Sequence, residues 1–97
     1  MKQLTVYCSH DLESKVIAAF DHAGVPGFLR LGGVTGHQAM PPGEYPRTAG
    51  WEAALFLVPW VEDDGVDRIV EQLEAHAGRC GEGPCLHIVV SGIERIV

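Results

Sequence analysis

Residues 4–23 read LTVYCSHDLESKVIAAFDHA, and the spacing of their apolar side chains changes from every second residue to every third or fourth. The first part alternates and contains β-branched and aromatic residues, which predicts a strand with Leu4, Val6 and Cys8 on its buried face. The second part has helical spacing, and Gly24 ends it. The apolar face of this helix consists of Leu12, Val16, Ala19, Phe20 and Ala23.

A further strand completes the first unit, and a second unit of the same kind follows it. Its elements are separated by turn residues, and a stretch rich in Gly and Pro divides it from the first unit. The expected elements are a strand from Phe28 to Val34 or Thr35, a long loop over 36–50, a strand over 51–60 bent or ended by Pro59, a helix over 66–77, a strand over 86–90, and either a short strand or a tail over 93–97.

The resulting order is β-α-β, a long loop, and β-α-β. Two such units with short connections predict a single α+β domain over residues 1–97, a ferredoxin-like βαββαβ sandwich with an antiparallel sheet and two helices on one face. The other face of the sheet would then carry apolar groups such as Tyr7, Trp51 or Trp60. Copies of the chain are expected to cover that face, which predicts a homotrimer.

Charge and hydropathy exclude two classes of partner. The 97 residues carry a net charge of -6, from 13 acidic and 7 basic side chains, and nucleic-acid binding requires clustered Lys and Arg. The longest apolar run, over 53–60, is far too short to span a bilayer, so no direct membrane insertion is expected. The first residues have no features of a secretory signal, which predicts a cytoplasmic protein.

The segment Cys80-Gly-Glu-Gly-Pro-Cys85 holds two of the three cysteines in a short turn. The turn allows a reversible disulfide, a site for a soft metal ion, or an ordinary loop with two small apolar fillers. His76 and His87 flank it, and two thiolates with one or two imidazoles would suit Zn(II) or Cu(I). No catalytic residues are expected, because Cys8 and His10 are a pair in sequence only and no triad spacing is present.

Several short motifs resemble those of the PII-like signalling proteins, a superfamily of trimeric ferredoxin-like domains structurally close to the CutA-like trimers. The resemblance covers nearly the whole chain. It rests on AGVPGF at 23–28, TGHQ at 35–38, the helix over 66–77, GEG at 81–83 and IVVSGIE at 88–94. It identifies 36–50 with the flexible T-loop and 78–87 with the B-loop, in which His87 occupies the position of a phosphate-binding Lys.

The resemblance implies a regulatory protein that senses an adenine nucleotide or bicarbonate in clefts between subunits and signals through the T-loop to a partner, a transporter by analogy with transporter-associated members. Glycine-rich turns bind anions through consecutive backbone N–H groups. The residues expected to bind the ligand are Gly36, His37, Gln38, Arg47, Arg79, Gly81, Glu82, Gly83 and His87. The competing hypothesis is a metal- or redox-responsive protein, CutA-like in role, that uses Cys80 and Cys85 with His76 and His87.

Overall fold

The computed structural model describes residues 1–39, 42–43, 48–78 and 86–97. Four strands and two helices follow one another in the predicted order β-α-β-β-α-β, and a short 3-10 turn precedes each helix. The elements are β1 (Lys2–Ser9), α1 (Glu13–Ala23), β2 (Leu29–Ala39), β3 (Thr48–Val61), α2 (Val66–Ala77) and β4 (Leu86–Gly92).

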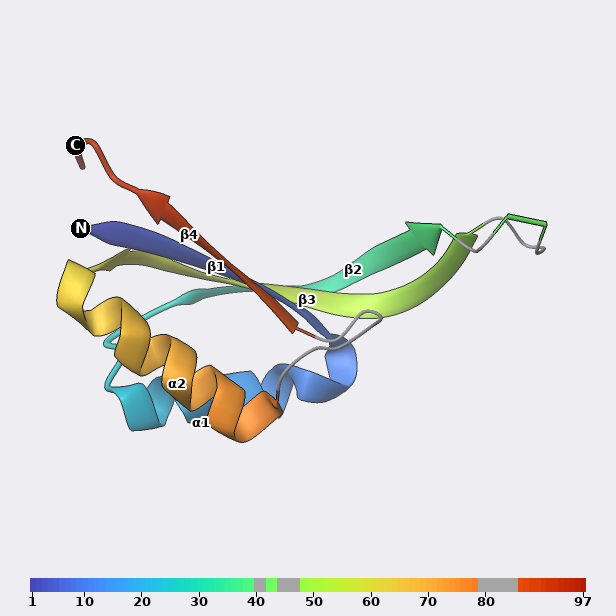
Figure 1. Ribbon diagram of the computed structural model, residues 1–97, viewed down its shortest axis with the longest axis horizontal. Coiled ribbons are helices and arrows are strands. Elements are labelled where there is room, and N and C mark those ends of the chain that lie inside the picture. The colour runs from blue at the N-terminus through green and yellow to red at the C-terminus, as the bar shows by residue number, and fades with distance from the viewer. Residues whose placement is uncertain (40–41, 44–47, 79–85) are drawn as a thin grey trace.

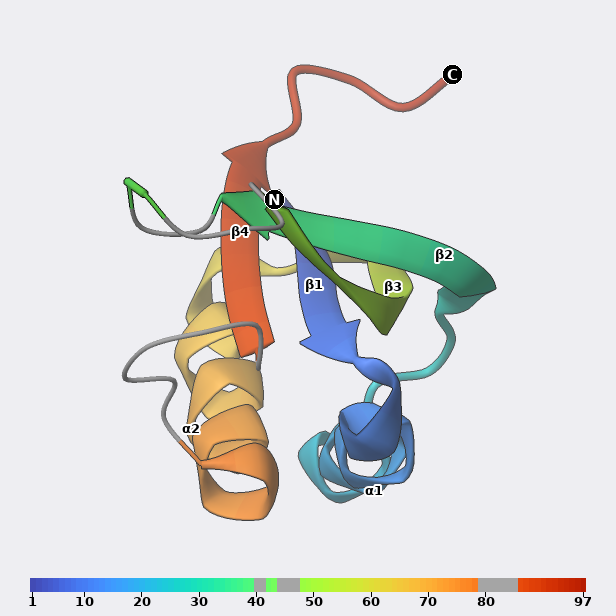
Figure 2. The same cartoon turned by 90° about the vertical axis from the view of Figure 1, so that its right-hand side faces the viewer.

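The strands form one antiparallel sheet in the order β2-β3-β1-β4. Both helices lie side by side on one face of this sheet, as Figures 1 and 2 show from two directions. This is the predicted α+β arrangement, and it is compatible with a ferredoxin-like fold. Residues 93–97 form a tail, which settles the alternative that the sequence left open there.

The core lies between the helices and the sheet and follows the predicted periodicities. Leu4 and Val6 of β1 are fully buried, and Cys8 is 3% exposed. The ring of Phe20 packs against Phe28 and Phe56, with ring centroids 5.0 and 5.9 Å apart. The helix ends at Gly24, whose φ of 75° is the left-handed cap that glycine adopts without strain. Other buried apolar side chains are Val16, Ala19, Ala54, Val58, Ile69, Leu73 and Leu86.

The predicted loop over 36–50 is wrong in part, because β2 and β3 extend into it. Gly36 pairs with Trp51, His37 with Gly50, and Ala39 with Thr48. Ladder hydrogen bonds use the backbone alone, so a stretch with few apolar side chains can still continue a sheet. The hairpin projects beyond the helices (Figure 1) and elongates the molecule to 46 × 28 × 22 Å. Residues 40–41 and 44–47 of that stretch lie outside the described part.

Two irregularities interrupt the register of the long strands. In β2, Gly32 and Gly33 together oppose Ala54, and Gly33 has a φ of 70°, which marks a β-bulge. In β3, Pro59 falls where the pairing with β1 shifts by one residue, and the strand continues to Val61, so of the predicted bend or end at Pro59 the end is wrong.

Candidate functional site

The sheet face opposite the helices is apolar and uncovered in the single chain. The register places Tyr7, Leu31 and Leu55 side by side on this face, in three adjacent strands. Tyr7 is 45% exposed and Leu31 51% exposed, while Leu55 is half-buried. The same face carries Leu29, Val34, Leu57 and Val89.

A cavity of about 190 Å³ opens on this face at the base of the hairpin. Two residues that the sequence singled out as ligand-binding, Gly36 and His87, line it together. The family resemblance implies a ligand site in clefts between subunits, and one chain already brings these two residues to one cavity. The other lining residues are Tyr7, Cys8, Val34, Thr35, Trp51, Ala53, Ala54 and Leu55.

Strand pairing fixes the walls of this cavity. His87 of β4 lies directly opposite Tyr7 of β1, and both are exposed. Trp51 lies opposite Gly36, and its indole covers the Gly36 backbone so closely that a Cβ there would be 2.4 Å from the ring. Glycine at position 36 therefore allows the indole to form one wall.

The remaining predicted ligand residues are placed as follows. His37 is exposed on β2, and one of its ring carbons would be 3.4 Å from a Cβ added at Gly50. Gln38 belongs to β2 and pairs with Ala49. Arg47 and the segment 79–85 lie outside the described residues, and with them Arg79, Cys80, Gly81, Glu82, Gly83 and Cys85.

The described walls of the cavity include neither Lys nor Arg. The side-chain polar groups that these walls carry on the open face are the Tyr7 hydroxyl, the indole N–H of Trp51 and the imidazole of His87. Aromatic and aliphatic surface with a few hydrogen-bonding groups suits a flat heteroaromatic ring better than a small, strongly hydrated anion.

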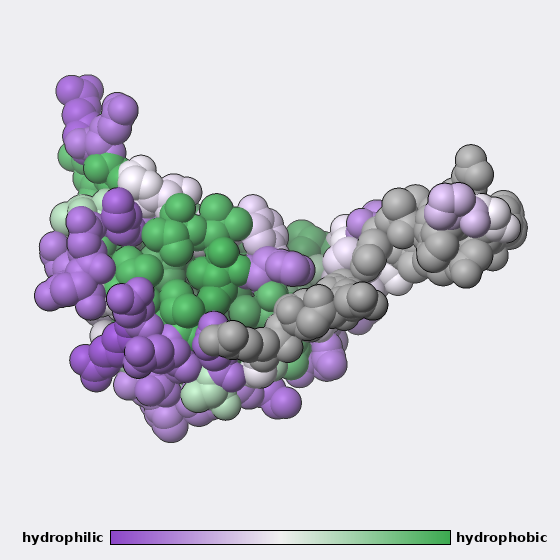
Figure 3. Space-filling model, in the orientation of Figure 1, coloured by the Kyte–Doolittle hydropathy of each residue, from purple (hydrophilic) through white to green (hydrophobic). Residues whose placement is uncertain are grey.

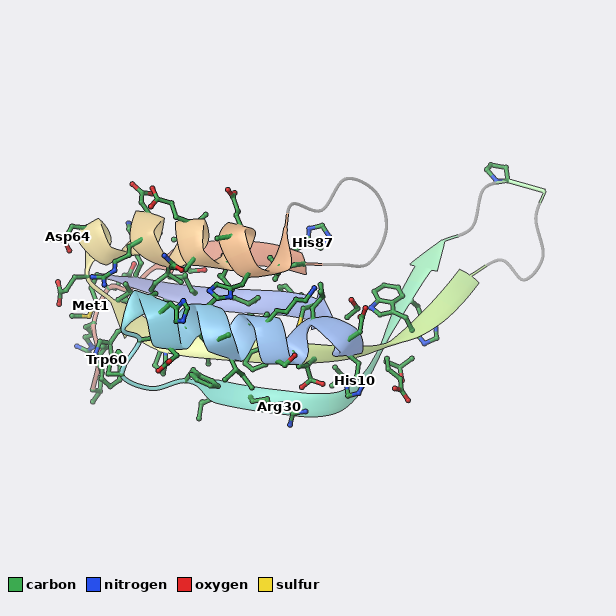
Figure 4. The ribbon with its side chains drawn as sticks, turned by 90° about the horizontal axis from the view of Figure 1, so that it is seen from below. Met1, His10, Arg30, Trp60, Asp64 and His87 are labelled. Atoms are coloured by element: carbon green, nitrogen blue, oxygen red, sulfur yellow. The ribbon has the colours of Figure 1, made fainter. Side chains whose placement is uncertain are left out.

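A charged cluster lies on the helix side of β2, where Arg30, Glu13 and His10 meet. The Arg30 Nε donates to Glu13 Oε1 at 2.5 Å, and His10 Nδ1 contacts Glu13 Oε2. Figure 4 shows Arg30 and His10 on the same side of the molecule. Burial alone would raise the pKa of Glu13, but the hydrogen bonds from Arg30 and His10 outweigh it, so the pKa lies below 4.5. Since Glu13 binds Arg30, this guanidinium is already engaged by a carboxylate.

Arg30 was missed by the sequence analysis. The signal in the sequence was a single basic residue between two leucines of a strand, Leu29 and Leu31. Alternation puts Arg30 on the opposite face from these leucines, which is the face toward the helices. Arg30 also lines a second cavity of about 200 Å³, next to His10 and Glu52. Its guanidinium lies over Gly32, where an added Cβ would be 2.5 Å from Nη2.

The histidines of the predicted metal site lie on opposite sides of the sheet. His87 lines the open-face cavity, whereas His76 belongs to the helical layer, where its Nε2 lies 3.1 Å from Nδ1 of His22. Within the described residues, no group of three or more His, Cys, Asp or Glu side chains is placed to hold a metal ion.

Cys8 is the free cysteine of the described chain, and it is buried. Burial, together with the nearby carboxylates of Glu13 and Asp11, raises the pKa of its thiol to about 11. The thiol therefore remains protonated at neutral pH and is a poor nucleophile or metal ligand.

The edge of the sheet at β4 also leaves apolar surface uncovered. Val90 is 44% exposed, and Ile88 is half-buried. Figure 3 shows apolar surface gathered between the C-terminal tail and the polar side of α2. The uncovered apolar area thus includes an edge as well as a face.

Compared with known proteins, the chain matches no protein-family model and no curated protein. None of the helices in the described ranges has the length and hydropathy needed to span a membrane.

Proposed function

We propose that this chain is a ligand-sensing regulatory protein of the PII-like kind that works as a homotrimer. The observation that carries the proposal is the cavity at the base of the hairpin, lined by both Gly36 and His87. The βαββαβ order, the apolar open face and the projecting hairpin are consistent with that class.

The trimer is supported by the amount of apolar surface on the open face. Leu29, Leu31, Tyr7 and Val89 are each between 45% and 57% exposed there. Contiguous apolar patches of this kind in a protein with a mixed-charge surface mark contacts with other chains. A closed ring of three copies would cover the face of every copy in the same way.

The ligand site is proposed to lie between copies. A volume of about 190 Å³ is below the roughly 300–1,000 Å³ of ordinary ligand pockets. One chain thus supplies part of a site, and the neighbouring chain supplies the rest.

An adenine nucleotide is the ligand that fits these walls best. Its base would stack on Trp51 or Tyr7, and His87 would donate to a ring nitrogen or a phosphate oxygen. Bicarbonate is the alternative small anion. The hairpin that projects beside the site would carry the signal to a partner, for which a membrane transporter is proposed.

Two measurements test the proposal. Light scattering should give three times the monomer mass at micromolar concentration. Calorimetry with ATP, ADP and bicarbonate should show binding by the wild-type chain. His87→Ala should weaken this binding. His22→Ala, which removes an exposed histidine of the helical layer, should leave it unchanged. A monomer, or equal weakening by both variants, would refute the proposal.

A further inference from the structure

The two helices bring a pair of histidines together on the side of the molecule away from the cavity. His22 lies in the last turn of α1 and His76 in the last turn of α2. Their rings are 4.7 Å apart between centroids and inclined at 72°, and His76 Nε2 lies 3.1 Å from His22 Nδ1. The two residues are 54 positions apart in the sequence.

The C-terminal ends of the two helices point in opposite directions, so the contact between His22 and His76 depends on how their side chains reach along the groove. Each helix runs back against the strand that precedes it, and these two strands, β1 and β3, are antiparallel. The two helices are therefore antiparallel as well. Side chains of a helix lean toward its own N-terminus, so His22 and His76 lean toward one another along the groove between the helices. Both helices are anchored in the core, where Ala19 of α1 and Leu73 of α2 are buried.

We propose that His22 and His76 form a binding site for a divalent transition-metal ion, with Cu(II) preferred over Zn(II). Two imidazole nitrogens bound to one metal ion at about 2.0–2.1 Å, with an angle of about 90–110° between them, lie roughly 2.8–3.4 Å apart. The 3.1 Å separation of Nε2 and Nδ1 falls within this range. His22 is exposed and His76 half-buried, and a rotation of the rings turns both lone pairs toward a shared ion.

Binding requires no net loss of a proton from the neutral pair. In the hydrogen bond, one of the two nitrogens carries the proton and the other accepts it. When a metal ion enters, that proton moves to the other nitrogen of the same ring. Both Nε2 of His76 and Nδ1 of His22 then present a lone pair to the metal.

The described part of the chain supplies two ligands to this site. Since the described residues place no third His, Cys, Asp or Glu beside this pair, water or an exchangeable ligand completes the coordination. With only two imidazoles, affinity follows the intrinsic order of the metals, in which Cu(II) exceeds Zn(II). The net charge of -6 adds a favourable long-range attraction for any cation. Neither His22 nor His76 lines the proposed ligand cavity.

The test uses full-length protein with Cys80→Ser and Cys85→Ser, so that thiols neither bind nor reduce the metal. Titration with Cu(II) is carried out at about pH 7.5, above the usual imidazole pKa of about 6.5. The variants are His22→Asn and His76→Gln, whose amides occupy the positions of Nδ1 and Nε2 but are weak metal ligands. His37→Ala, which removes an exposed histidine of β2, is the control.

We expect one Cu(II) per chain with a nitrogen-ligand signature in electron paramagnetic resonance. Each of the two variants should weaken binding by roughly tenfold or more, since each leaves a single imidazole in place of a chelating pair. The double variant should lose little beyond either single one, and His37→Ala should bind as the parent does. Equal affinity in His22→Asn and the parent, or the same loss in His37→Ala, would overturn the proposal.

Discussion

Arg30 holds the carboxylate of Glu13 at the junction between β2 and α1. Its Nε lies 2.5 Å from Oε1, its Nη2 contacts the same oxygen, and His10 contacts the other. Within the described residues, Glu13 is the one charged side chain that is buried. Both carboxylate oxygens are therefore satisfied, and the contact ties the start of the first helix to the strand that continues into the hairpin.

Replacing Glu13 by Gln should destabilise the fold. The change removes the charge that Arg30 and His10 bind, and hydrogen bonds to charged groups contribute about 1.5–3 kcal/mol. We expect the free energy of unfolding in urea to fall by about 1–2 kcal/mol, because Arg30 remains half-exposed and regains water. Glu71→Gln, at an exposed carboxylate of α2, should change it by less than about 0.5 kcal/mol. Equal effects of the two changes would contradict a stabilising role for the contact.

The stability that Glu13 contributes should depend on pH in one direction. Its pKa is lower in the folded protein than its ordinary value of 4.5, so the folded state binds this proton less readily than the unfolded state. The contribution is complete above pH 4.5 and is lost as the pH falls through the folded-state value. The difference in unfolding free energy between wild type and Glu13→Gln should thus shrink steadily below pH 4.5 in urea titrations. A difference that stays constant down to about pH 2 would show that the carboxylate charge contributes nothing.

A charge on the open sheet face should separate the proposed copies. Leu31 is 51% exposed there, and Ile17 is 42% exposed on α1, so the two are matched in chemistry and accessibility. Leu31→Glu should shift light scattering toward the monomer mass, because an unpaired carboxylate in an interface is costly. Ile17→Glu should leave the mass unchanged. If Ile17→Glu dissociates the assembly instead, the copies meet through the helices.

Local periodicity predicted most of the fold. The alternation at Leu4, Val6 and Cys8 and the helical spacing through Phe20 each matched the buried face found in the structure. The extent of β2 was missed because its last residues, Gly36 to Ala39, carry no apolar pattern and are held by pairing with β3. Backbone pairing within such a hairpin leaves no periodic signal in the side chains.

The candidate site was predictable only in its residue types. Gly36 and His87 were identified from motifs, but their meeting in one cavity depends on the strand order that places β1 between β3 and β4. The contact of His22 with His76 depends likewise on how two distant helices pack. Contacts across such separations follow from tertiary structure, and a single sequence does not specify them.

Substituting Gly36 by Ala should disturb the cavity. The new methyl group would be 2.4 Å from the Trp51 ring, so the indole must move. We expect a loss of stability of about 1–3 kcal/mol, as for other overpacked sites, and a shift in tryptophan fluorescence. Gly27→Ala is the matched control, since nothing lies within 4 Å of a Cβ there. A fluorescence spectrum unchanged by Gly36→Ala would mean that Trp51 does not cover Gly36 in solution.

Cys8 should stay reduced under conditions that oxidise the other two cysteines. Burial, Glu13 and Asp11 raise the pKa of its thiol to about 11. At about pH 8 roughly one molecule in a thousand carries the reactive thiolate. Cys80 and Cys85 are separated by four residues, two of them glycines, and should form a reversible intrachain disulfide after mild diamide treatment. Peptide mapping by mass spectrometry should locate that bond, and iodoacetamide should label Cys8 only after unfolding. A disulfide that includes Cys8, or its rapid labelling in the folded protein, would show that the core opens around β1 and would remove the basis for a switch confined to the turn.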